Sequence, residues 1–310
     1  MTEQGIDDDA AIRCLGVTKR FGPVTALDGL DLSVPRGAIV GYLGPNGAGK
    51  STTLRILLDL ARADTGDVRV LGADPRRAGP GLRRRIGYLP GELRLDERLT
   101  VDETLSSWAT LRGGDVDGAY RRELCERLSL DPSRATHGLS SGNRRKVGLA
   151  GAFMARPELL ILDEPTSGID PLVQEEFLQL AEEARDEGRT VFLSSHVLSE
   201  VQRIADLVIV LRAGRVVATG DVAELRRTAR QPFRAWFAGA PPVGALRSVA
   251  GVSELEVRGS EVSGVIEGPP GPLLAVLVAH PVEHLLLPEP DLEQAFLRFY
   301  EADAIATGPP

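Results

Sequence analysis

The segment Leu43 to Leu54, LGPNGAGKSTTL, places three glycines in a short turn ahead of a lysine and hydroxyl residues. Glycines leave the backbone bare, so successive N–H groups can point at the oxygens of a polyphosphate. The lysine adds a positive charge, and a serine hydroxyl can bind Mg²⁺. Residues 44–51 fit the pattern GxxxxGK[ST], with a strand-like run before them and a helical pattern after them. The turn therefore predicts a nucleoside triphosphate site.

Each position of this turn has an expected task. Lys50 would bridge the β- and γ-phosphates, Ser51 would bind Mg²⁺, and Thr52 would lie on the α-phosphate side. A glycine-rich turn with a solvated lysine is the alternative, and the agreement of spacing and flanks disfavours it. The residues predicted to bind the phosphates are Gly44, Pro45, Asn46, Gly47, Ala48, Gly49, Lys50, Ser51 and Thr52.

Two further segments carry polar groups at the ends of apolar runs. Asp163 and Glu164 follow the run LLIL, where Asp163 can bind the metal and Glu164 can take or orient the proton of an attacking water. His196 follows the run TVFLS, where it can hydrogen-bond the γ-phosphate and the water. A surface acidic pair and a structural histidine are the alternatives. With the phosphate turn present, we predict Glu164, His196 and Lys50 as the catalytic residues.

The elements that must position these groups form an α/β pattern. From residue 12 to about 220, short β-branched runs alternate with helical patterns, which predicts a parallel sheet flanked by helices. The strand signal vanishes between residues 92 and 156, which predicts a helical insert. The expected strands include residues 38–43, 159–162, 190–194 and 207–211.

The composition changes after a polar stretch at residues 221–232, where we place a domain boundary. The tail reads as βαββαβ, the order of a ferredoxin-like domain. A last helix puts four apolar residues at helical spacing, a stripe that is expected to pack on a core, with a partner surface as the alternative. The tail elements are expected at 233–238, 243–249, 252–258, 261–267, 272–280 and 282–286, and the stripe is Leu292, Ala295, Phe296 and Phe299.

Composition excludes several classes of protein. The chain has 310 residues, 43% of them apolar and 26% charged, which is ordinary for a globular protein. No apolar run approaches the roughly 20 residues that span a bilayer, and the acidic start lacks a secretory pattern, so cytoplasm is the expected compartment. Cys14 and Cys125 stand far apart and are expected to be buried and free. A net charge of -8 disfavours a nucleic-acid partner.

The segment His137 to Pro157, HGLSSGNRRKVGLAGAFMARP, makes a family recognisable. It resembles the LSGGQ signature of ATP-binding cassette (ABC) ATPases, and with the other motifs the resemblance covers residues 12–220. In that family two nucleotide domains close head to tail, and each signature covers the ATP held by the other subunit. The resemblance assigns this role to Ser140, Ser141, Gly142 and Asn143, of which Ser141 and Asn143 replace the usual Gly and Gln.

Other positions match the family residue by residue. Phe21 stands where an aromatic ring stacks on adenine, with a packed core residue as the alternative. His196 stands at the switch histidine. The family's LPQ segment reads Leu89-Pro90-Gly91-Glu92, so Glu92 is a further candidate for the metal or the water. The D-loop that contacts the partner subunit corresponds to Ser167, Gly168, Ile169 and Asp170.

The resemblance implies a fold and a domain plan. Residues 1–220 are expected to form a P-loop NTPase domain of the ABC type, with a RecA-like core and a helical subdomain at about 93–156. A linker helix is expected at 221–232 and a small α+β ferredoxin-like domain at 233–310.

The tail further resembles the ATPases of daunorubicin- and bacitracin-resistance exporters. The resemblance implies an active ATPase with ATP and Mg²⁺, working as a homodimer or heterodimer on the inner face of the plasma membrane. Its partner would be a separate membrane permease that exports a drug, antibiotic, lipid or glycan. The permease is expected to contact residues 87–104, with lid packing as the alternative for each candidate: Glu92, Leu93, Leu95 and Leu99.

Two rival functions remain at this stage. A soluble ABC ATPase acting on nucleic acid or ribosomes usually carries a coiled-coil insert or tandem cassettes, and neither is visible. A non-hydrolysing regulatory module is disfavoured by the presence of Glu164.

Overall fold

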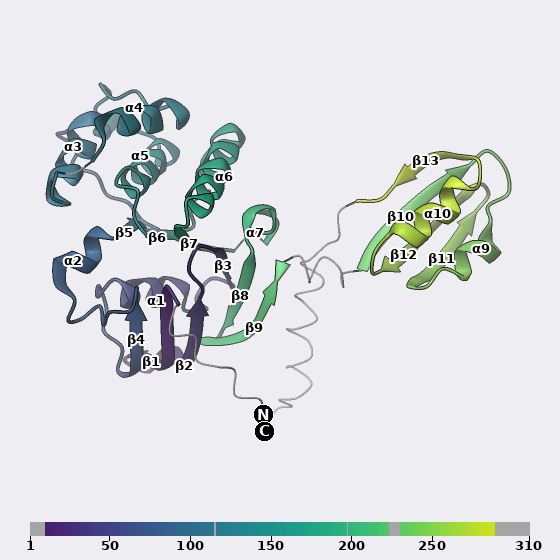
Figure 1. Ribbon diagram of the computed structural model, residues 1–310, viewed down its shortest axis with the longest axis horizontal. Helices are drawn as coiled ribbons and strands as arrows, with labels where there is room; N and C mark the ends of the chain where they lie inside the picture. Colours follow the sequence, from purple (N-terminus) through teal and green to yellow (C-terminus); the bar gives the residue numbers. More distant parts are fainter. Residues whose placement is uncertain (1–9, 115, 197, 223–229, 289–310) are drawn as a thin grey trace. The chain divides into compact units, whose positions relative to one another are not determined.

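The computed structural model describes residues 10–114, 116–196, 198–222 and 230–288. The chain divides into two compact units, Met1–Thr219 and Gly220–Pro310 (Figure 1). Within the described residues, no helix is both long and apolar enough to cross a bilayer.

The first unit is built around a six-stranded sheet in the order β5-β6-β7-β3-β8-β9. Neighbouring strands from β5 to β8 run parallel. Every residue of β3, β6 and β7 is buried, which explains the apolar runs IVGYL of β3, LLIL of β6 and VFL of β7. The four strands expected from the sequence are confirmed within one residue at each end. The strands are β3 (Ile39–Leu43), β5 (Ile86–Leu89), β6 (Leu159–Asp163), β7 (Thr190–Ser195), β8 (Leu207–Arg212) and β9 (Arg215–Asp221).

A second sheet of the first unit is antiparallel, in the order β2-β1-β4, and the sequence pattern did not predict it. The strands are β1 (Ile12–Phe21), β2 (Val24–Val34) and β4 (Thr65–Val70). Register shifts interrupt the pairing of β1 with β2, so the alternation of apolar and polar residues is broken. One core cluster joins this sheet to β3 and to helix α1 (Lys50–Leu57), through Leu30, Tyr42 and Leu54 among others.

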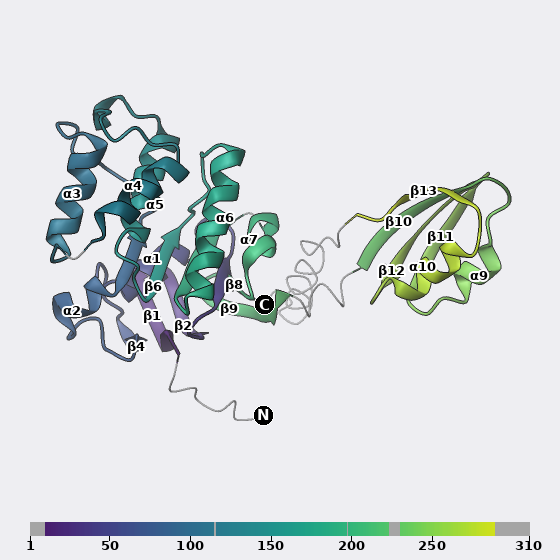
Figure 2. The same cartoon turned by 45° about the horizontal axis from the view of Figure 1, so that its top comes forward.

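Helices make up the segment between β5 and β6, where the described residues contain no strand. Thr100 begins α3 with a capping box: its hydroxyl accepts from the Glu103 N–H, and the Glu103 carboxylate accepts from the Thr100 N–H. Figures 1 and 2 both show α3, α4 and α5 grouped away from β1, β2 and β4. The helices of the unit after α1 are α2 (Gly79–Arg84), α3 (Val101–Leu111), α4 (Gly118–Arg127), the 3₁₀ turn η1 (Thr136–Gly138), α5 (Ser141–Phe153), α6 (Pro171–Asp186) and α7 (Leu198–Ile204).

Between residues 230 and 288, the second unit has the order βαββαβ and a fully antiparallel sheet, β11-β12-β10-β13. This is the ferredoxin-like arrangement that the sequence predicted. Phe233 and Ile266 from the sheet pack with Leu273 from α10 in its core. Its elements are β10 (Arg230–Phe237), α9 (Val243–Arg247), β11 (Val252–Arg258), β12 (Glu261–Glu267), α10 (Gly271–Val278) and β13 (Val282–Leu286).

The segment predicted as a linker helix, residues 221–232, differs from that prediction at both ends. β9 continues to Asp221, and β10 begins at Arg230, so residues 221 and 230–232 are strand. Residues 223–229 lie outside the described residues. The predicted last helix, with its stripe at Leu292, Ala295, Phe296 and Phe299, also lies outside them.

Candidate active site

The phosphate turn connects the end of β3 to the start of α1. Pro45, Asn46 and Gly47 are exposed, and Gly49 is the N-cap of α1 with a φ of 113°. A Cβ at Gly49 would lie 2.5 Å from the Ala26 carbonyl oxygen, and one at Gly44 would lie 2.4 Å from that of Leu211. These two glycines are therefore required because the turn packs closely on β2 and β8. Gly47, with a φ of 82°, has open space around it and faces solvent.

Lys50 is buried at the centre of this turn. Its Nζ donates to the Gly44 carbonyl oxygen at 2.5 Å and to that of Pro45 at 3.3 Å. Burial lowers the pKa of Lys50, while the carboxylates of Glu164 and Asp163 act in the opposite direction. The ammonium group therefore lies within the electrostatic reach of the acidic pair. Ser51 is exposed and Thr52 is half-buried on the first turn of α1.

Asp163 ends β6 and is almost fully buried, with 5% of its surface exposed. The hydroxyl of Ser194, its partner across the β6–β7 pairing, donates to Asp163 Oδ1 at 2.5 Å. This bond holds the carboxylate in a fixed orientation at the strand end. Ser194 was not among the residues predicted from the sequence, because nothing in the run TVFLSS distinguishes a serine that faces the neighbouring strand.

Glu164 leaves the strand in a different direction. Its φ of 50° lies in the left-handed region, and its N–H donates to the Ser194 carbonyl oxygen at 3.2 Å. Its side chain is 27% exposed, far more than that of Asp163. The two adjacent carboxylates therefore occupy different environments, one fixed and buried and the other open to solvent.

His196 lies directly beside Glu164. Its Nδ1 is 3.1 Å from Glu164 Oε1, although 32 residues separate the two in the sequence. His196 follows β7 as Glu164 follows β6, and these strands are parallel neighbours, so both side chains reach the same edge of the sheet. The structure thus brings Lys50, Asp163, Glu164 and His196 together at the carboxyl edge of the parallel sheet.

The signature residues begin α5. Ser140 is its N-cap, with the hydroxyl accepting from the Asn143 N–H at 3.2 Å, while Ser141 is exposed. A Cβ at Gly142 would lie 2.4 Å from the Gly168 carbonyl oxygen, so the start of α5 packs directly on the segment Ser167 to Asp170. The signature and the predicted D-loop are therefore in contact within one chain.

An ion pair strengthens this contact between the signature helix and the D-loop. Lys146 Nζ lies 3.0 Å from Asp170 Oδ2. The other oxygen of Asp170 accepts from the Val173 N–H at 3.1 Å and caps α6, while Ile169 is buried. The D-loop is thereby tied to α5 and to α6 at once.

In the segment after β5, Gly91 rather than Glu92 lies against Asp163, the candidate metal ligand. A Cβ at Gly91 would lie 2.9 Å from Asp163 Oδ2, whereas the Glu92 side chain is exposed. Arg145, which sequence reasoning did not select, donates to carbonyl oxygens of this segment. A groove of about 590 Å³ opens beside it, lined by residues 91–95, Glu97, Thr136, Ser141, Arg144, Arg145, Ser167 and Gly168.

Phe21 is 53% exposed at the end of β1, which rules out the packed core residue that was the alternative. The Lys19 ammonium lies 5.2 Å from the centre of its ring. Val24, its partner across the β1–β2 pairing, is also exposed. An aromatic ring presented in this way is free to stack on a flat ligand.

The donor set fits a nucleotide with Mg²⁺. Ser51 and Asp163 offer a hydroxyl and a carboxylate, the hard oxygen ligands that Mg²⁺ prefers. Lys50 and the start of α1 offer positive charge to phosphate. A strand, a bare turn and a helix, with an acidic pair at the end of another parallel strand of the same sheet, define a nucleoside triphosphatase of the P-loop class.

Comparison with known proteins identifies the family. Residues 27–167 match the family described as ABC transporter. Daunorubicin resistance ATP-binding protein DrrA3 of Streptomyces coeruleorubidus is 42% identical over 222 residues, 70% of each chain. Linearmycin resistance ATP-binding protein LnrL of Bacillus subtilis is 32% identical over 297 residues, 91% of this chain and 95% of its own. A post-hydrolysis dimer of the ATP-binding cassette MJ0796, bound to ADP and Pi, matches with a TM-score of 0.61 and 25% identity over 68% of this chain and 98% of its own.

The chain therefore belongs to the ABC transporter family, as an ATP-binding subunit. Such a subunit hydrolyses ATP with Mg²⁺, forms dimers and pairs with a separate membrane permease. The predicted family, fold class and resemblance to drug-resistance ATPases are confirmed. The rival function on nucleic acid or ribosomes is not favoured.

Proposed function

We propose that Glu164 is the general base of ATP hydrolysis and that His196 orients it. The contact of His196 Nδ1 with Glu164 Oε1 at 3.1 Å carries this proposal. When Nδ1 donates to one carboxylate oxygen, the other remains available to accept a proton from water. The partial exposure of Glu164 gives water access to it, which the buried Asp163 does not have.

The neighbouring residues supply the remaining roles. Lys50 binds the terminal phosphates, and residues 44–52 surround them with backbone N–H groups. Ser51 and Asp163 hold Mg²⁺, which offsets the negative charge of the phosphates when bound. Phe21 stacks on adenine, and Ser140 to Asn143 face the ATP of the partner subunit, with Ser167 to Asp170 beside them. Glu92 is exposed and remains a second candidate for the metal.

Three variants test the roles proposed for Glu164, His196 and Asp163. Glu164→Gln keeps the size of the side chain and removes its basicity, so kcat should fall by about 10² to 10⁴-fold while ATP still binds. His196→Ala should lower kcat less, because the base itself remains. Ser194→Ala should raise the Mg²⁺ concentration needed for half-maximal activity, since Asp163 loses its orienting hydroxyl. Unchanged turnover in Glu164→Gln would contradict the assignment.

We further propose that the subunit powers export of a small antibiotic-like molecule, from a position on the cytoplasmic side of the membrane. The names of the two relatives, which are resistance ATP-binding proteins, support export rather than import. The groove lined by residues 91–95 is our candidate for the contact with the permease, and it includes Glu92, Leu93 and Leu95 of the four residues predicted from the sequence. For the domain organisation, we propose that the helices at 93–156 form the helical subdomain and that the second unit is an accessory domain.

Trapping the ATP-bound protein tests whether its partner is a membrane permease. Tagged Glu164→Gln protein, expressed in its native host and held with ATP and Mg²⁺, should co-purify with a polytopic membrane protein from detergent-solubilised membranes. Recovery of soluble or nucleic-acid-bound complexes alone would contradict the transport role. A matched sample with ADP in place of ATP is the control, because ADP should not hold the closed dimer.

A further inference from the structure

Arg145 makes three hydrogen bonds to the main chain of two neighbouring strand ends. Its NH1 donates to the Pro90 carbonyl oxygen at 2.9 Å and to that of Asp163 at 3.1 Å, and its NH2 donates to that of Gly91 at 2.8 Å. Pro90 follows β5, and Asp163 ends β6. One guanidinium group on α5 therefore joins both strand ends to the helix that begins with the signature residues.

These hydrogen bonds hold the main chain on both sides of the expected metal site. Gly91 approaches Asp163 so closely that a Cβ would lie 2.9 Å from Asp163 Oδ2. Asp163 is held through its side chain by Ser194 on β7 and through its carbonyl oxygen by Arg145 on α5. Removing Arg145 would leave the Pro90–Gly91 turn and the main chain at Asp163 without a shared donor.

Arginine is suited to this position. Burial lowers the pKa of Arg145, while Asp163 and Glu164 favour its charged form. Its planar group presents donors in fixed directions, so it can reach three carbonyl oxygens at once. A lysine at this position would keep the positive charge but would lose the planar group with its several N–H donors. A glutamine would keep two N–H donors but would lose the charge.

We infer that Arg145 is a positioning residue for ATP hydrolysis, which holds Asp163 and the Pro90–Gly91 turn in a fixed relation to the start of α5. The inference rests on the proposed role of Asp163 as the Mg²⁺ ligand. The start of α5 carries Ser140 to Asn143, which serve the partner's ATP in the proposed dimer. Arg145 thus connects, within one chain, the residues for its own ATP with those for the other.

The test compares Arg145→Gln and Arg145→Lys with Arg121→Gln. Arg121 also donates from a guanidinium group, to Ser106 Oγ at 2.7 Å and to Asp102 Oδ1 at 3.0 Å, but within the helical segment alone. Steady-state ATPase assays give kcat, the KM for ATP and the Mg²⁺ concentration for half-maximal activity. Binding of a fluorescent ATP analogue is measured with Mg²⁺ and with EDTA.

Arg145→Gln should lower kcat by about 10- to 100-fold and raise the half-maximal Mg²⁺ concentration about 10-fold. Binding of the analogue should weaken with Mg²⁺ and stay within about 2-fold of wild type in EDTA, because the phosphate turn is untouched. Arg145→Lys should fall between the wild type and Arg145→Gln. Arg121→Gln should keep the wild-type kcat and Mg²⁺ response.

Two results would overturn the inference. One is a kcat and Mg²⁺ response within about 2-fold of wild type in Arg145→Gln. The other is equal weakening of binding with Mg²⁺ and in EDTA, because that would indicate general damage to the fold. Glu164→Gln, assayed alongside, separates a failure of the proposed catalytic site from a failure of the role proposed for Arg145. If it retains full turnover, the proposed site fails and the inference fails with it; if only Arg145→Gln is unaffected, the proposed site stands.

Discussion

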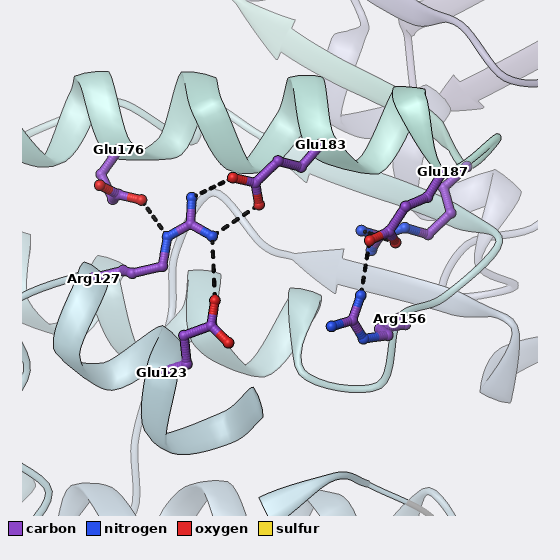
Figure 3. A network of polar contacts seen from close by, with 7 residues as sticks. Glu123, Arg127, Arg156, Glu176, Glu183 and Glu187 are labelled. Carbon is purple, nitrogen blue, oxygen red and sulfur yellow. Dashed lines mark hydrogen bonds and ion pairs between the residues drawn. The ribbon is translucent and has the colours of Figure 1, made fainter. Parts of the chain in front are cut away.

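Arg127 on α4 is the centre of an ion-pair network that joins the helical segment to α6 (Figure 3). Its NH1 and NH2 lie 2.8 Å from the two carboxylate oxygens of Glu183, and its Nε donates to Glu176. Glu123, one turn earlier on α4, lies 3.6 Å away. We predict that Arg127→Ala destabilises the first unit, because it removes the side chain that bonds to both Glu176 and Glu183 on α6.

The exposure of Arg127 and its partners sets the expected loss of unfolding free energy. Arg127 and Glu176 are 20% and 23% exposed, whereas Glu183 is 49% exposed. Exposed pairs contribute about 0 to 1 kcal/mol, and breaking a buried pair costs about 3 to 5 kcal/mol. The network lies between these limits, so the free energy of unfolding should fall by about 2 kcal/mol. For a unit of this size the midpoint temperature should fall by about 4 to 8 °C.

Fluorescence of Trp108 provides the assay. The chain has two tryptophans, and Trp236→Phe leaves only Trp108, which lies on α3 and packs against Gly151 of α5. Urea and thermal unfolding followed at this residue report on the first unit. Glu123→Gln is the control and should cost less than about 0.5 kcal/mol, because that pair is longer and its carboxylate is 54% exposed.

The effect should depend on pH. The hydrogen bonds of Arg127 lower the pKa of Glu183 from its usual 4.5. A lowered folded-state pKa stabilises the fold above the unfolded value, and this contribution is lost as the pH falls through the folded value. The difference between wild type and Arg127→Ala should therefore be largest near neutral pH and shrink below pH 4.5. A loss below about 0.5 kcal/mol at neutral pH would refute the reasoning.

Three further predictions concern the site and the core. Gly142→Ala should abolish most ATPase activity and lower stability by about 1 to 3 kcal/mol, since its Cβ would lie 2.4 Å from the Gly168 carbonyl oxygen; wild-type turnover would show that the two segments can separate freely. Phe21→Ala should weaken ATP binding by about 2- to 10-fold, while Phe21→Tyr restores it; equal affinity in all three proteins would remove the ring from the site. Cys14 is buried and free, and burial raises its pKa to about 12, so it should react with a thiol reagent at pH 8 only after unfolding; rapid labelling of the native protein would contradict this.

The sequence alone determined the elements whose patterns are local. The glycines and Lys50 required a turn between a strand and a helix, and the run LLIL required a buried strand ending at Asp163. The βαββαβ order of the tail followed from short apolar runs separated by Gly and Pro, and three of its strands have the predicted bounds. Because parallel strands end at one edge, the meeting of Glu164 with His196 could also be anticipated.

Only the tertiary structure decided the contacts between segments distant in sequence. The antiparallel sheet of β1, β2 and β4 escaped prediction because register shifts break its alternation. Ser194 and Arg145 act on Asp163 from β7 and α5, through a hydroxyl and a guanidinium group that carry no local pattern. Similarly, Gly91 rather than Glu92 lies against Asp163, because a missing Cβ permits a close approach that residue type alone does not reveal. Local propensity selects the elements, whereas packing across the sheet selects which polar groups meet.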